Sequence, residues 1–198
     1  KTISYMASPA HEGGGHRLLA IPSRERLVRA LKYVLDEDEF LSPYGIRSLS
    51  RVHEKHPYVF RVGDQEYRVD YAPGDSTTSM FGGNSNWRGP IWLPLNYLLI
   101  EALERYDFFY GEDLQVECPT GSGRFMRLKQ VAREIAARVE RLFLPDERGV
   151  LPCWGPHGER FARYSNFCDL VPFHEYFHAE KGWGCGAEHQ TGWTSLVV

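Results

Sequence analysis

Three stretches of the chain repeat apolar residues at the spacing of an amphipathic helix. The first follows Ser23, an expected N-cap, and contains Leu27, Leu31, Val34 and Leu35. The second follows Pro90, which we expect as the first helical residue, and contains Ile91, Leu95, Leu98, Leu99, Ala102 and Leu103. The third and clearest contains Leu128, Val131, Ala132, Ile135, Val139 and Leu142. Each pattern predicts a helix with one buried face.

The remaining pattern consists of one strand signal, one weaker helix and long loops. Residues 58–62 and 67–71 flank the turn residues 63–66, which predicts a β-hairpin. Residues 170–178 are expected to form a short helix with Pro172 in its first turn. Residues 72–89 and 145–163 are expected to be loops, the second with an exposed Trp154. The predicted fold is therefore mainly α, with one small β-hairpin, in a single domain.

Composition and charge narrow the classes of function. The net charge of −3 gives no reason to expect nucleic acid or an anionic membrane surface as a partner. No apolar run approaches the ~20 residues that span a bilayer. The four cysteines are scattered without CxxC spacing, so the sequence contains no zinc-ribbon pattern. A reduced, cytoplasmic setting is expected. No sequence feature requires a cofactor.

The stretch 82–103, GGNSNWRGPIWLPLNYLLIEAL, combines a polar glycine-rich loop with the start of a buried helix. Side chains in such a loop are held by rigid packing and stay accessible, which suits a binding site. A loop capped by tryptophans that pack on their own helix is the structural alternative.

This stretch resembles a known enzyme family. The segments NSNWRGPIWLPLNYLLIEAL, FLSPYGIRSLS and EYFH…HQTGWTSLV are similar, in the same order, to the C-terminal half of the catalytic domain of glycoside hydrolase family 63. That family includes processing α-glucosidases and mannosylglycerate hydrolases and is related to the trehalases. The resemblance covers residues 18–198.

The resemblance implies a fold and a partner. The family fold is an (α/α)6 toroid of twelve helices, which needs well over ~300 residues. We therefore expect this chain to be a fragment, the C-terminal part of one catalytic domain. Its expected partner is the missing N-terminal half, and the fragment alone is expected to lack activity.

The pentapeptide His174-Glu175-Tyr176-Phe177-His178 supports two incompatible interpretations. As HExxH on a helix, it would place two imidazoles on one face for zinc, as in a metalloprotease. Against this, the next glycine is Gly182, one residue too late for the extended motif, and Pro172 leaves little helix before it. The resemblance instead implies that Glu175 is the general base of an inverting glycosidase acting on α-glycosidic bonds. Glu188 is the second candidate for the base.

An inverting glycosidase also needs a general acid. In the family this is an Asp well upstream of the NWRGP loop. Asp70 and Asp75 precede the loop, but neither lies in the Trp-Asp context of the family. The acid is therefore expected upstream of this chain, and a non-catalytic carbohydrate-binding or interaction module remains an alternative.

The resemblance also implies residues that contact an oligosaccharide or a small glycoside. Tryptophan offers a stacking surface for a sugar ring, while arginine and asparagine donate hydrogen bonds to hydroxyls. Trp92 and Trp193 could instead pack in the core, and Gln190 could instead belong to a polar turn. The expected contacts are Tyr44, Asn84, Asn86, Trp87, Arg88, Trp92, Gln190 and Trp193.

Overall fold

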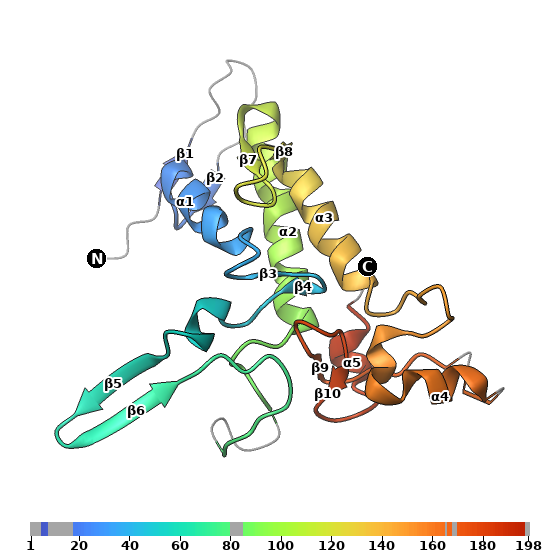
Figure 1. Cartoon of the computed structure of the whole chain (residues 1–198). Coiled ribbons are helices and arrows are strands. Elements are labelled where there is room, and N and C mark those ends of the chain that lie inside the picture. The colour runs from blue at the N-terminus through green and yellow to red at the C-terminus, as the bar shows by residue number, and fades with distance from the viewer. Residues whose placement is uncertain (1–4, 8–17, 80–84, 165, 168–169, 197–198) are drawn as a thin grey trace.

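The computed structural model describes residues 5–7, 18–79, 85–164, 166–167 and 170–196. These residues are mainly helical, with small antiparallel strand pairs. Two long helices, α2 (Leu93–Tyr110) and α3 (Leu128–Glu140), run antiparallel and side by side through the middle of the molecule (Figure 1). Helix α1 (Arg24–Val34) packs beside the C-terminal end of α2.

The predicted helices α1 and α3 are confirmed. The hydroxyl of Ser23 accepts a hydrogen bond from the Arg26 N–H at 3.4 Å, as an N-cap does. Leu31 of α1 and Ile135 of α3 are buried in one cluster with Leu103 of α2. The apolar faces of the three helices thus share one core.

Helix α2 differs from its prediction at its start and in its buried face. Ile91 exchanges backbone hydrogen bonds with Phe177 at 2.8 and 3.0 Å, which holds it extended, so the helix begins at Leu93 rather than Pro90. Leu95 and Leu98, expected on the buried face, are 44% and 64% exposed.

The polar Asn96 explains this rotation of the helix. It is 1% exposed and faces the core, where its side chain accepts from the Ile46 N–H at 2.7 Å. Its amide group also donates to the carbonyls of Ile46 and Trp92. The other buried residues of the helix are Leu93, Leu103 and Asp107.

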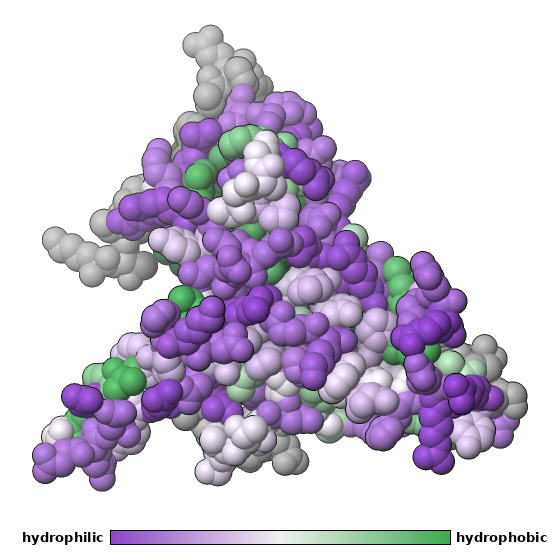
Figure 2. Space-filling model, in the orientation of Figure 1, coloured by the Kyte–Doolittle hydropathy of each residue, from purple (hydrophilic) through white to green (hydrophobic). Residues whose placement is uncertain are grey.

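The expectation of a single β-hairpin was wrong, because the described residues form five two-stranded pairs. These are β1–β2 (Tyr5–Ala7, Leu18–Ala20), β3–β4 (Leu41–Ser42, Gly45–Ile46), β5–β6 (Tyr58–Val62, Gln65–Val69), β7–β8 (Gln115–Glu117, Phe125–Arg127) and β9–β10 (Tyr176–Phe177, Gly184–Cys185). Most are too short for a sequence pattern to reveal. The predicted hairpin is β5–β6, although its second strand begins at Gln65 rather than Tyr67 and its turn is shorter than expected. It extends from the body as an arm with exposed hydrophobic residues (Figures 1 and 2).

Short elements gather at the N-terminal end of α2. They are the 3-10 helix η4 (Pro152–His157), α4 (Gly158–Arg163), α5 (Thr191–Thr194) and the β9–β10 pair. Elsewhere in the described residues lie the 3-10 helices η1 (Arg51–Glu54) and η3 (Gly111–Asp113). Trp154, expected in an exposed loop, is 7% exposed and donates from Nε1 to the Leu170 carbonyl.

A buried ion pair fixes the segment that follows β9. Arg47 is 3% exposed, and its Nε and Nη2 donate to the Glu180 carboxylate at 2.8 and 3.1 Å. The Tyr71 hydroxyl donates to the same carboxylate at 2.5 Å. Arg47 also forms a β-bridge with Ile91, so segments far apart in sequence meet beside α2.

Candidate functional site

Glu175 directly precedes β9, between the loop that leads into α2 and the turn after β10. Its Oε1 accepts a hydrogen bond from the Ser85 hydroxyl at 2.8 Å. Its Oε2 accepts one from the Ala187 N–H at 3.2 Å, and its own N–H donates to the Ala187 carbonyl at 2.9 Å. The half-buried carboxylate is thus oriented by one donor from each side.

Tyr176, the residue after Glu175, belongs to an aromatic cluster with three tryptophans. Trp87 stacks on Trp92 with ring centroids 3.9 Å apart and an interplanar angle of 3°. Trp92 stacks in turn on Tyr176 at 4.7 Å and meets Trp193 edge-on at 5.5 Å. The structure therefore brings all three predicted tryptophans together. Trp92 is 1% exposed, whereas Trp193 is 40% exposed.

Asn86 and Arg88 of the NWRGP loop are buried rather than open to solvent. The Asn86 side chain donates to the carbonyls of Ala72 and Gly74 at 2.8 and 2.6 Å and accepts from the Arg88 N–H at 3.0 Å. Arg88 is 4% exposed and donates to Asn86 and to the Ser76 hydroxyl. These side chains hold the loop 72–76 against the loop 85–88. Asn84 lies outside the described residues.

The other predicted residues occupy different surroundings. Glu188 is exposed, and Gln190 is half-buried with its backbone N–H bonded to the Phe173 carbonyl. Tyr44 packs against the hydrophobic cluster around Leu142 and Phe177, and burial raises the pKa of its phenol. Tyr44 is thus a packing residue in this structure.

The pentapeptide from His174 to His178 contains a two-residue strand and no helix, so the expected helix at residues 170–178 is wrong. Tyr176 and Phe177 form β9, because Phe177 pairs with Ile91 on one side and Gly184 on the other. Without a helix, the two imidazoles are not placed one helical turn apart on one face, as an HExxH zinc site requires.

The two histidines are instead enclosed by backbone. A Cβ placed on Gly184 would lie 2.0 Å from the His174 ring, so that ring rests directly on the glycine. The His174 Nδ1 is buried without a hydrogen-bond partner. The His178 Nδ1 accepts from the Glu180 N–H at 3.1 Å, and burial lowers the pKa of both imidazoles. Among the described residues, no three His, Cys, Asp or Glu side chains gather as a metal site would need.

Asp75 lies at the site, although its sequence context gave no reason to place it there. Its Oδ1 accepts from the Gly186 N–H at 3.1 Å and from the Tyr176 hydroxyl at 3.3 Å. Asp70, by contrast, pairs with Arg68 at the base of the β5–β6 arm. Ser85 was missed as a partner of Glu175, although it belongs to the NSNWRGP segment that carried the resemblance.

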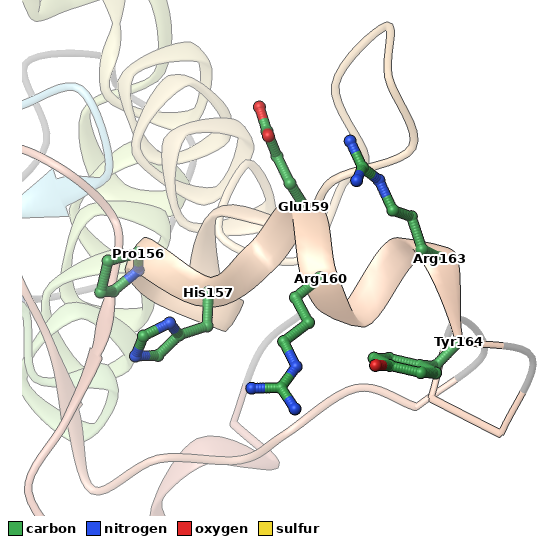
Figure 3. Close-up of a pocket in the computed structure, with 6 residues that line it drawn as sticks. All are labelled: Pro156, His157, Glu159, Arg160, Arg163 and Tyr164. Atoms are coloured by element: carbon green, nitrogen blue, oxygen red, sulfur yellow. The ribbon is translucent and has the colours of Figure 1, made fainter.

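A separate surface depression of about 560 Å³ lies along α4 (Figure 3). Its lining side chains do not converge on one point, since Glu159 extends to the opposite side of the helix from Arg160 and Tyr164. It contains none of the residues around Glu175. Its lining comprises Pro156, His157, Glu159, Arg160, Arg163 and Tyr164. Over the part of the chain that is described, no helix is long and apolar enough to span a membrane.

Comparisons with known proteins show the family to which the chain belongs. Residues 17–194 match the family model of the mannosylglycerate hydrolase MGH1-like glycoside hydrolase domain. The chain is 52% identical over 195 residues to the uncharacterized protein YMR196W of Saccharomyces cerevisiae, a match that covers 98% of this chain and 18% of that protein.

Two glucosidases are more distant relatives. The mannosyl-oligosaccharide glucosidase of S. cerevisiae is 27% identical over 174 residues, and the probable mannosyl-oligosaccharide glucosidase of Schizosaccharomyces pombe is 29% identical over 173 residues. Each match covers 87% of this chain and 15% of the relative, so the chain spans less than a fifth of all three proteins. Since the family model matches nearly the whole chain, the chain belongs to the MGH1-like glycoside hydrolase domain family.

Proposed function

We propose that this chain forms the C-terminal part of the catalytic domain of an inverting glycoside hydrolase, with Glu175 as its general base. The observation that carries the proposal is the Glu175 carboxylate, held by Ser85 and Ala187 one residue before Tyr176, which stacks on Trp92. An ionised carboxylate only accepts hydrogen bonds, and both contacts are donated to it. Such a group can take a proton from water.

In this reaction Glu175 removes a proton from water as the water oxygen attacks the anomeric carbon. The glycosidic C–O bond breaks, and a carboxylic acid donates its proton to the departing oxygen. We assign that acid to a part of the enzyme outside this chain, because Asp75, the nearby carboxylate, already accepts two hydrogen bonds at one oxygen.

Exposed apolar side chains support an (α/α)6 toroid completed by further polypeptide. Leu95, Leu98 and Phe108 on α2 are 44%, 64% and 77% exposed, and Leu19 and Ile21 beside that helix are 77% and 71% exposed. A helix that is apolar on more than one face is typical of an interior helix. The relatives, of which this chain matches 15–18%, contain enough further sequence to cover it.

The names of the relatives guide the choice of substrate. We infer an α-linked glucosyl oligosaccharide or a mannosylglycerate-like glycoside, with the sugar ring against Trp193 and Trp87. Glu188, exposed on the turn after β10, is the alternative base.

The test is hydrolysis of these two substrate classes by the full-length protein and by two variants. Glu175→Gln keeps the size of the side chain but removes the base, and it should lower kcat by about a hundredfold or more, because general base catalysis contributes roughly 10²–10⁴-fold. The matched control Glu188→Gln should keep kcat within a few-fold. Loss of activity in the control alone would transfer the role to Glu188. Binding without cleavage by the wild-type protein would favour a carbohydrate-binding module.

A further inference from the structure

Two carboxylates hold the same two-residue turn. The N–H of Gly186 donates to Asp75 and the N–H of the next residue, Ala187, donates to Glu175. The two N–H groups are separated only by the φ and ψ of Gly186, because each peptide group is itself planar. The position of one contact therefore constrains the other.

The turn also lies very close to the Glu175 side chain. Gly186 has φ +69°, and a Cβ placed on it would lie 2.8 Å from the Glu175 Oε2 and 2.6 Å from the Tyr176 ring. No space separates the turn from the carboxylate. A shift of the turn must therefore shift the carboxylate, which has to be within a fraction of an ångström of its productive place.

Asp75 is itself held firmly on the side away from the turn. Asn86 donates to the carbonyls of Ala72 and Gly74, on the residues that lead to Asp75. The Tyr176 hydroxyl donates to the same Asp75 oxygen as Gly186 does. Burial, together with the neighbouring Asp75 charge, raises the pKa of the Tyr176 phenol, which keeps this hydroxyl a donor.

We propose that Asp75 is a positioning residue for Glu175, which it holds in place through the Gly186–Ala187 turn. The proposal rests on the proposed function, since positioning matters only if Glu175 acts in catalysis. Asp75 takes no proton and contacts no reacting atom in this role. It supplies an acceptor at a fixed place.

The test uses the full-length protein and separates the acceptor from its charge. Asp75→Ala removes the acceptor and should lower kcat by about ten- to a hundredfold with KM changed less than threefold, as misplacement of a catalytic group does. Asp75→Asn keeps an oxygen for Gly186 and Tyr176 and should restore kcat to within about fivefold of wild type. The control Asp70→Ala, whose side chain is 44% exposed and pairs with Arg68, should leave kcat unchanged.

Two kinetic outcomes would overturn the proposal. One is an Asp75→Ala variant that unfolds at the wild-type temperature and keeps kcat within twofold. The other is equal loss in Asp75→Ala and Asp75→Asn, which would mean that the charge acts on the reaction directly.

Amide hydrogen exchange at Gly186 and Ala187 provides a readout that does not depend on catalysis. Exchange should be faster in Asp75→Ala than in Asp75→Asn or wild type, and equal rates in all three would also overturn the proposal. If Glu175→Gln stays fully active, the proposed function fails, whereas the exchange rates still report whether Asp75 holds the turn.

Discussion

Replacing Glu180 by glutamine should destabilise the fold strongly, because it leaves Arg47 without a counter-charge. The Arg47 side chain is 1% exposed and that of Glu180 is 28% exposed. The carboxylate accepts two hydrogen bonds from Arg47 and one from Tyr71. Glutamine offers one oxygen and directs an N–H group toward the guanidinium.

The expected loss of unfolding free energy is about 2–3 kcal/mol. Breaking a fully buried ion pair costs roughly 3–5 kcal/mol, and the partial exposure of Glu180 lowers that figure. For a chain of this size, each kcal/mol shifts the melting temperature by about 2–4 °C, so Tm should fall by roughly 4–12 °C. Thermal and urea unfolding of the purified protein measure this loss.

The matched control is Glu66→Gln, which breaks an exposed pair. Arg61 and Glu66 on the β5–β6 arm have side chains 75% and 45% exposed, and such pairs contribute about 0.2–1 kcal/mol. A Glu180→Gln variant no less stable than Glu66→Gln would refute the role of the Arg47–Glu180 pair.

The pH dependence gives this prediction a second check. Burial alone would raise the pKa of Glu180, but the hydrogen bonds from Arg47 and Tyr71 outweigh it and hold that pKa below its ordinary value. The unfolded chain therefore binds this proton more readily. The stabilisation is complete above about pH 4.5 and is lost as the pH falls through the folded-state pKa. The difference between wild type and Glu180→Gln should shrink over that acidic window.

Three further predictions follow from other close contacts. Asn96→Ala removes the buried partner of the Ile46 backbone and should lower the unfolding free energy by about 2–3 kcal/mol in urea titrations. A change of less than about 0.5 kcal/mol, as for a surface substitution, would contradict this role. Gly186→Ala forces a Cβ to 2.8 Å from the Glu175 carboxylate at a positive φ and should lower kcat at least tenfold, while an unchanged kcat would show that the turn yields freely. Burial lowers the pKa of His174, so stability should be full above about pH 6.5 and fall as the pH drops below it; His174→Gln should lose less stability between pH 7.5 and 5.5 than wild type does.

The elements that the sequence predicted correctly are those specified by local contacts. Ser23 caps α1 within one turn, and the apolar stripe of α3 repeats over thirteen residues. The β5–β6 hairpin has its turn residues between its two strands. In each case the sequence pattern that specifies the element lies within the element or next to it, even though its buried face packs on distant residues.

The incorrect predictions involve partners that are distant in sequence. Ile91 and Phe177 lie 86 residues apart, and their pairing draws both out of the helices that local periodicity favoured. The burial of Asn96 was also missed, because its hydrogen-bond partner Ile46 lies 50 residues away in the sequence. Local hydrophobic periodicity does not specify such long-range pairings. For the same reason the sequence did not place Asp75 near Glu175.

Polar and aromatic side chains near Glu175 have different roles: the polar ones hold the NWRGP loop in place, and Trp193 remains exposed. Asn86 and Arg88 are 0% and 4% exposed and donate their hydrogen bonds to groups inside the protein. They therefore fix the loop from which Ser85 donates to Glu175. A strand of two residues is too short to fix the position of Glu175 by itself. Its position depends on these loop contacts and on the pairing with Ile91. Trp193, expected to contact sugar, is 40% exposed, so substitutions of Trp193 should weaken substrate binding and raise KM. Asn86 is buried and holds the loop, so substitutions of Asn86 should lower kcat.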